Sequence, residues 1–187
     1  MTLGRAALIA LIDRYLNGLL DPFVSLLEIH KLMYFLQEAG LELRLQYEAK
    51  PYGPYARNLR QVLIRLEKHY MQGYGDGKDV PTRPIELLPG AVEEAKSFLV
   101  QHPDILKRMD RVVELIDGYE DSYGLELLST VHWVMRHNPE AREKPQAAIE
   151  AVCNWTARKR RNLKPDHLLK AWQRLKEQGW NPLPGSA

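Results

Sequence analysis

The sequence has little cysteine, no long apolar run and almost no net charge. Its single cysteine, Cys153, excludes an internal disulfide and a cysteine-based metal cluster, which fits a reducing compartment. The apolar run at residues 6–12 is followed at once by Asp13 and Arg14, so it is too short for a signal peptide or a membrane span. These absences predict a cytoplasmic protein that makes no use of a membrane.

Motifs for catalysis are also missing. The six histidines form no HExxH pattern and have no cysteine partners, which argues against a zinc site. The glycine-rich stretch at residues 73–77 lacks a following Lys-Ser/Thr pair, and neither a GxGxxG nor a GxSxG motif occurs. We therefore expect no catalytic residues, no metal and no cofactor, and we expect that the chain is not an enzyme.

What is present is the composition of an ordinary globular domain. The chain has 187 residues, of which 45% are hydrophobic and 27% charged. A chain of this size and composition buries enough apolar surface to fold without disulfides or metals. We expect a single domain over residues 1–182 and a flexible tail over residues 183–187.

Charge is unevenly distributed along the chain although its net value is only +2. Residues 110–126 contain six acidic side chains and one basic one, whereas residues 158–176 contain eight basic side chains and one acidic one. One region is therefore acidic and another basic, and this distribution says more about partners than the net charge does.

Apolar periodicity predicts mostly helix. A helix nearly apolar all round is expected over residues 24–39, which would make it the central helix of the core. Alternation over Leu43–Ala49 predicts a half-buried strand, and residues 85–88 suit a second short strand. The other expected helices end near Leu19 or span residues 55–70, 89–99, 103–116, 122–135 with Ser122 as N-cap, 145–158 and 165–178. The predicted fold is mainly α (α+β): a compact helical domain with a small two- to three-stranded β-ribbon, similar to a winged helix.

The Tyr52-Gly53-Pro54-Tyr55 segment predicts a stiff turn that leads into a helix. Pro51 and Pro54 restrict the residues before them, and Pro54 suits the first turn of a helix. The two tyrosines suit either packing at the helix entry or contact with a partner.

Several short motifs resemble a known family. The helix motif HKLMYF with His30, Lys31 and Tyr34, the turn with Gly53 and Pro54, and the later motif from Trp155 to Lys159 resemble the C-terminal, toxin-binding domain of DarG antitoxins, which is related to SocA/Panacea antitoxin domains. The resemblance spans nearly the whole chain and is densest over residues 30–66.

The resemblance implies a two-part antitoxin, with a macrodomain that removes ADP-ribose from DNA and a C-terminal domain that binds the DarT toxin, a DNA ADP-ribosyltransferase. This chain would be the toxin-binding part alone. It would block the toxin's site for single-stranded DNA by imitating phosphates with carboxylates and bases with aromatic rings. The implied partner is the toxin. The domain is expected to be a monomer when free or to form a 1:1 heterodimer with the toxin. The isolated domain is not expected to bind nucleic acid.

The acidic region supplies the first candidates for toxin contact, because two tyrosines there bracket two carboxylates just before a helix: Tyr119, Glu120, Asp121 and Tyr123. Tyr52, Tyr55 and Arg57 are further candidates, since a tight interface needs several aromatic or arginine anchors. Another interpretation makes the acidic region a solvated loop in which Asp121 favours the start of the next helix.

Two other functions fit the same residues. The basic run Arg158–Arg161 beside Trp155 suits contact with DNA phosphates, as in a winged-helix transcriptional regulator. A Panacea-type antitoxin for an unrelated toxin is the remaining alternative.

Overall fold

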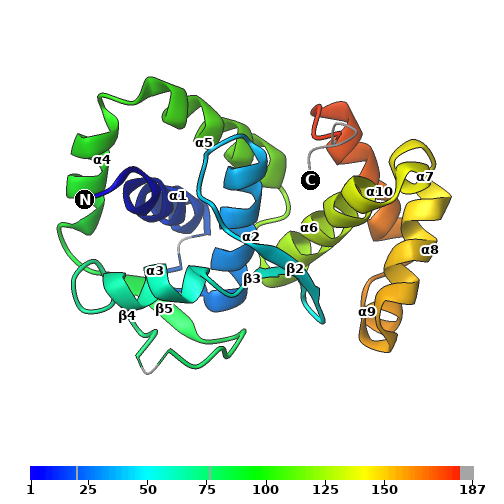
Figure 1. The fold of residues 1–187 in the computed structure, drawn as a ribbon, viewed down its shortest axis with the longest axis horizontal. Coiled ribbons are helices and arrows are strands. Elements are labelled where there is room, and N and C mark those ends of the chain that lie inside the picture. Colours follow the sequence, from blue (N-terminus) through cyan, green and yellow to red (C-terminus); the bar gives the residue numbers. More distant parts are fainter. Residues whose placement is uncertain (20, 76, 182–187) are drawn as a thin grey trace.

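The chain is mainly helical with small antiparallel sheets over the residues that a computed structural model describes, 1–19, 21–75 and 77–181 (Figure 1). This confirms the predicted mainly α class. The helices are α1 Leu3–Leu19, α2 Leu26–Glu38, α3 Leu59–Leu66, α4 Ala91–Leu99, α5 Pro103–Ile116, α6 Ser122–His137, α7 Pro139–Glu143, α8 Pro145–Trp155, α9 Ala157–Asn162 and α10 Pro165–Glu177. The strands are β1 Val24–Ser25, β2 Tyr47–Lys50, β3 Gly53–Ala56, β4 Met71–Gln72 and β5 Pro84–Leu87. The tail predicted at residues 183–187 lies outside the described residues.

Two helices form the centre of the core. In α2, ten of the thirteen residues are buried, as the sequence predicted for this helix. In α1, residues 6–12 are all buried, because α2, α4 and α5 pack around it (Figure 1). Ser25 and Glu28 form a reciprocal capping box at the start of α2, and Tyr15 of α1 donates a hydrogen bond to Glu28 Oε1 (2.9 Å).

The strand predicted over Leu43–Ala49 is shorter and starts later, at Tyr47. Two side chains hold the preceding backbone in place of a neighbouring strand. Gln37 bonds both the N–H and the carbonyl of Leu45, and Asn58 bonds the N–H of Gln46 and the carbonyl of Arg44. Arg44 has a φ of 57°, which breaks the extended conformation there.

The Tyr52–Tyr55 segment is part of a β-hairpin and does not begin a helix, so that prediction was wrong. Gly53–Ala56 forms β3, which pairs with β2 in the register Tyr47↔Ala56 to Lys50↔Gly53, and α3 starts only at Leu59. The turn itself falls at Pro51 and Tyr52. Gly53 has a φ of 99°, a backbone angle that residues other than glycine rarely adopt. This angle lets the chain enter β3 directly after the turn.

Other boundaries differ in smaller ways. Asp121, and not Ser122, caps α6 by accepting a hydrogen bond from the N–H of Gly124 (2.5 Å). The helix predicted over residues 145–158 is divided at Thr156, whose side chain caps a separate helix, α9. The β-ribbon is two sheets: the hairpin β2–β3, and a three-stranded sheet in the order β1-β5-β4.

The amino-terminal helices meet the carboxyl-terminal ones at α6. Both α2 and β3 pack against α6, and α10 packs on α6 and α8 (Figure 1). This arrangement brings α9, which packs against α8, to the side of α6 that β3 covers, and the candidate site lies at this junction.

Candidate functional site

A cavity of about 320 Å³ lies between α2 and the β2–β3 hairpin. We call it the Lys31 pocket. Its lining includes His30 and Lys31 of α2, Tyr52, Gly53 and Tyr55 of the hairpin, and Asp79 from the loop before β5. Its volume is at the small end of the range of about 300–1,000 Å³ that ligand sites occupy.

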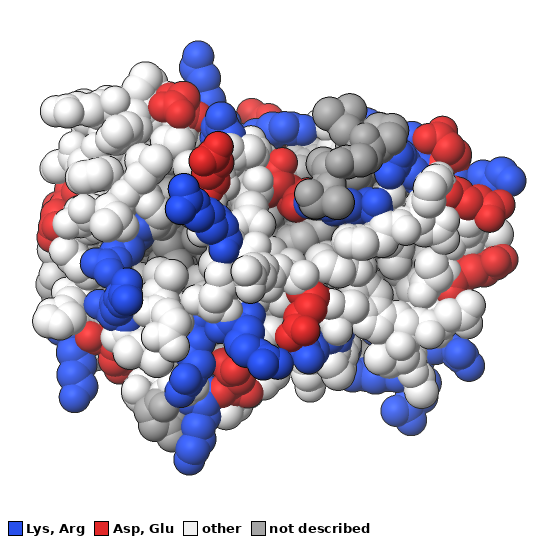
Figure 2. Space-filling model, viewed as in Figure 1, with Lys and Arg blue, Asp and Glu red and all other residues white. Residues whose placement is uncertain are grey.

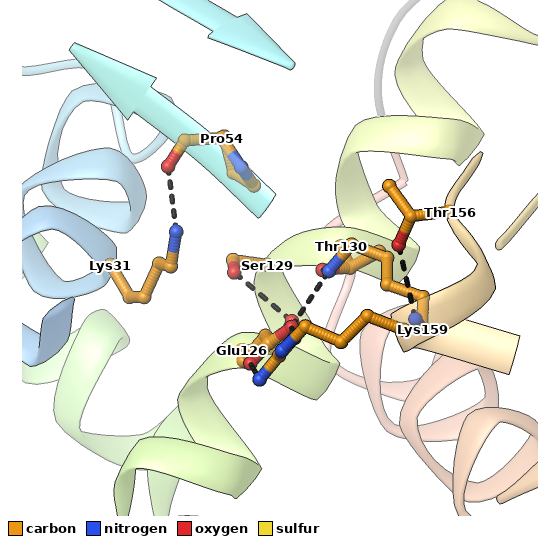
Figure 3. A network of polar contacts seen from close by, with 8 residues as sticks. Lys31, Pro54, Glu126, Ser129, Thr130, Thr156 and Lys159 are labelled. Carbon is orange, nitrogen blue, oxygen red and sulfur yellow. Dashed lines mark hydrogen bonds and ion pairs between the residues drawn. The ribbon is translucent and has the colours of Figure 1, made fainter. Parts of the chain in front are cut away.

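Lys31 is almost completely buried, with 2% of its surface exposed. Its Nζ donates a hydrogen bond to the carbonyl oxygen of Pro54 (2.7 Å), as Figure 3 shows. Burial, together with the charge of Lys159, lowers the pKa of Lys31 to about 7, and Glu126 opposes this shift.

Glu126 of α6 is the carboxylate of a buried charge cluster. Arg158 donates to both of its oxygens (2.7 and 3.2 Å), and Lys159 Nζ donates to Oε1 (2.8 Å). Lys159 also donates to Thr130 Oγ1 (3.0 Å) and is fully buried (Figure 3). Burial raises the pKa of Glu126, but the hydrogen bonds and charges of Arg158 and Lys159 outweigh it, so the carboxyl group is ionised.

Gly53 connects the pocket to this cluster. A Cβ atom at this position would lie 2.9 Å from Thr130 Oγ1 and 3.3 Å from Lys31 Nζ. The backbone of β3 therefore approaches α6 and Lys31 more closely than a chain with a side chain here could. Glycine is required by both the contact and the positive φ.

The hairpin candidates line the pocket or its rim. Tyr52 is 39% exposed, and the guanidinium of Arg158 lies 4.1 Å from its ring centroid. Tyr55 stacks on His30 at 4.3 Å, and its hydroxyl donates to Asp79. Arg57 is largely exposed and pairs with Glu48 at 3.7 Å.

Three of the acidic candidates, Tyr119, Asp121 and Tyr123, line another cavity, of about 280 Å³, and the candidates mainly bond within the chain. Glu120 accepts from the N–H of Gly118 (2.7 Å), and Asp121 caps α6. The hydroxyl of Tyr123 is hydrogen-bonded to His167 Nδ1 (2.9 Å), and Arg174 lies over the ring of Tyr119 at 5.6 Å. This cavity shares no lining residue with the Lys31 pocket, so the two predicted groups are not one surface.

The signature residues join the charge cluster. Lys31 bonds Pro54, Gly53 adjoins both Lys31 and Thr130, and Lys159 Nζ lies 5.0 Å from the ring of Trp155. Two signature side chains pack beside it on α2: His30 under Tyr55, and Tyr34, whose hydroxyl is hydrogen-bonded to His132 Nδ1 (2.7 Å).

Sequence reasoning missed Glu126, Thr130 and Asp79. Glu126 was counted only as one charge of the acidic region, and Lys159 belonged to the basic run and to the signature motif, with nothing to connect the two. The signal available was their neighbours: Leu125, Leu127 and Leu128 surround Glu126, a pattern typical of a buried helix.

Charges of both signs share the surface. On the face drawn in Figure 2, Lys and Arg side chains gather over α3 and the β2–β3 hairpin, with carboxylates beside them. Among the described residues, no group of three or more His, Cys, Asp and Glu side chains is placed to hold a metal ion. No helix in the described ranges is both long and apolar enough to cross a membrane.

Sequence comparison relates the chain to named enzymes. It is 47% identical over 137 residues to a DNA ADP-ribosyl glycohydrolase of Thermus aquaticus. This match covers 73% of this chain and 37% of that protein. It is 34% identical over 187 residues to proteins of the same name from Mycobacterium bovis and Mycobacterium tuberculosis, covering 94% of this chain and 53% of each. The chain thus spans about half or less of the length of these curated relatives. No protein-family model matches it.

These relatives correct the functional predictions. Their name denotes a hydrolase for ADP-ribosylated DNA, which contradicts the resemblance to a toxin-binding antitoxin domain and the neutralisation of a toxin by DNA mimicry. It also contradicts the expectation of a chain that is not an enzyme, and the two alternative functions fit no better. That expectation rested on the absence of known catalytic motifs, whereas the similarity to these enzymes extends over most of the chain.

Proposed function

We propose that the chain takes part in removing ADP-ribose from DNA and that the Lys31 pocket helps to hold the modified strand. The observation that carries the proposal is the identity of 34–47% to DNA ADP-ribosyl glycohydrolases over 73–94% of the chain. The nucleic-acid substrate replaces the toxin as the proposed partner.

The chemistry of the pocket supports a substrate of this kind. An ADP-ribosyl group on DNA brings phosphates, ribose and bases together, so a site for it needs cations and aromatic faces. The pocket offers Lys31, Lys50 and Arg57 as cations and Tyr52 and Tyr55 as aromatic rings. Asp79 adds a carboxylate that accepts hydrogen bonds from the hydroxyls of Tyr55 and Tyr74.

A segment exchange in the Mycobacterium tuberculosis relative tests the proposal. One variant lacks the segment that matches this chain, a second carries the matching residues of this chain instead, and a third carries them with Lys31→Met. The assay follows release of ADP-ribose from a modified oligonucleotide and separates kcat from KM.

We expect the deletion to raise KM about tenfold or more, the exchange to restore it, and Lys31→Met to raise it again. Unchanged kcat and KM after the deletion would show that this segment has no part in the reaction. Failure of the exchanged, folded protein to regain activity would equally refute the proposal for this chain.

Three finer expectations stay predictions. The β2–β3 hairpin beside helices supports a winged-helix-like arrangement, which a comparison of the helix order with such domains would test. A cytoplasmic location and a monomeric free domain are the others, and cell fractionation and sedimentation would test them.

A further inference from the structure

The buried charges around the Lys31 pocket do not balance. Three cationic side chains, the buried Lys31 and Lys159 and the partly exposed Arg158, act on one carboxylate, Glu126. Arg158 and Lys159 occupy both oxygens of Glu126. The cluster therefore carries an excess of positive charge, and two of its three cations, Lys31 and Lys159, are buried.

Lys31 holds the excess where a ligand can reach it. Among the described residues, Lys31 Nζ donates a hydrogen bond only to the neutral carbonyl oxygen of Pro54, so two of the three ammonium protons have no protein acceptor. The side chain lines the pocket and points away from Glu126 (Figure 3). A buried cation without an anion is costly, so an anionic ligand would gain from meeting it.

The rest of the pocket suits a ring attached to that anion. Tyr52 stands half-exposed at the rim, with Arg158 against its ring, and Tyr55 lies flat on His30. Lys50 and Arg57 at the rim share one carboxylate, Glu48, so these three side chains add one net positive charge. Asp79 is the opposing charge, and two tyrosine hydroxyls bond to it.

We propose that the Lys31 pocket binds a phosphate-bearing nucleotide, with a phosphate beside Lys31 Nζ and the base against Tyr52. Lys31 fixes the anion, Gly53 lets β3 pack closely against Lys31, and the tyrosine rings discriminate a nucleotide from free phosphate. The choice of ADP-ribose as the biological ligand rests on the proposed function, but the charge excess is independent of it.

Binding should depend on pH through Lys31. The groups that face it are His30 on α2, Glu126 on α6 and Lys159 on α9, with Asp79, Lys50 and Arg57 around the pocket. Because burial lowers the pKa of Lys31 to about 7 and an anion raises it, binding takes up a proton and weakens as the pH rises above 7.

Calorimetric titration of the whole chain with four probes tests this: ADP-ribose, ADP, adenosine and inorganic phosphate. We expect ADP-ribose and ADP to bind about tenfold or more tightly than adenosine or phosphate, since only they offer both anion and ring. Repeating the titration at pH 6.5 and 8.5, in two buffers of different ionisation enthalpy, should show weaker binding at the higher pH and proton uptake.

Two variants locate the site. Lys31→Met and the surface change Tyr52→Ala should each weaken ADP binding, by about fivefold or more for the tyrosine, while Lys144→Met, which alters an exposed ion pair on α7, should leave it unchanged. Thermal melting checks that each variant is folded. If Lys31→Met does not fold, Tyr52→Ala still decides the test.

Absence of binding by all four probes at millimolar concentration overturns the inference, as does ADP binding that Tyr52→Ala leaves unchanged. Phosphate binding as tight as ADP overturns the nucleotide assignment. These outcomes differ from failure of the proposed function, in which nucleotides bind as expected but the segment deletion leaves ADP-ribose release unchanged.

Discussion

Replacing Glu126 by glutamine tests the buried charge cluster most directly. The side chain of Glu126 is 5% exposed and that of Lys159 is fully buried, so the substitution leaves Lys159 charged in the interior without its counter-ion. Breaking such a pair by removing one partner costs about 3–5 kcal/mol. A domain of this size is stable by about 5–15 kcal/mol, so Glu126→Gln removes a large part of its stability.

Urea unfolding followed by circular dichroism measures the loss of stability. The melting temperature should fall by roughly 2–4 °C for each kcal/mol lost. The double variant Glu126→Gln with Lys159→Met removes both charges. We expect it to recover most of the stability, because Arg158 is partly exposed and can turn to water. The exposed pair of Glu140 and Lys144 is the control, and its loss should cost less than about 1 kcal/mol.

The dependence of stability on acid pH provides a second test of the same ion pair. The pKa of Glu126 is lower in the folded state than its ordinary value of 4.5, so its stabilisation is complete above 4.5 and is lost as the pH falls through the folded pKa. Glu126→Gln should therefore lose less stability in this acid range than the unmodified chain. A loss below about 1 kcal/mol at pH 7, or a double variant no more stable than the single one, would refute a buried, stabilising ion pair.

Three further changes have defined outcomes. Gly53→Ala should cost about 1–3 kcal/mol in urea unfolding, because its φ is 99° and its Cβ would meet Thr130 Oγ1 at 2.9 Å; a neutral effect would mean that β3 can move from α6. Tyr34→Phe should cost about 1–3 kcal/mol by leaving His132 without its hydroxyl partner, and an unchanged urea midpoint would contradict that bond. Burial lowers the pKa of both His30 and His132 from 6.5 to about 3. Stability should therefore fall as the pH drops below 6.5, by about 1.4 kcal/mol per pH unit for each histidine. Urea midpoints that stay level between pH 6.5 and 5 would exclude buried neutral rings.

Helices were the most predictable part of the fold, because the chain marks their ends clearly. Asp21 and Pro22 follow α1, Pro103 opens α5, and Gly179 follows α10. The strands were less predictable, since their limits depend on contacts between distant residues. The backbone of Leu45 bonds Gln37 and not a strand, and nothing local in residues 43–49 indicates that partner.

The candidate site was predictable in its residue types but not in its connections. A run of charges shows that a segment is polar, but not which member faces inward. The buried pair takes Glu126 from the acidic region and Lys159 from the basic run, 33 residues apart in the sequence. The acidic region has six carboxylates, and residues 158–176 have eight cations. Only the packing of α9 beside α6 determines that Glu126 and Lys159 form the buried pair.

The signature motifs marked a family resemblance in the sequence, and the structure gives one of their residues two roles. Lys31 holds the hairpin by its bond to Pro54, and the residue also lines the pocket. A side chain needed only for stability could be replaced by an apolar one of similar length, which avoids the cost of a buried charge. If Lys31→Met proves as stable as the unmodified chain but binds no nucleotide, the charge is kept for the ligand; if it unfolds the hairpin while Tyr52→Ala leaves ADP binding intact, the bond to Pro54 is its reason.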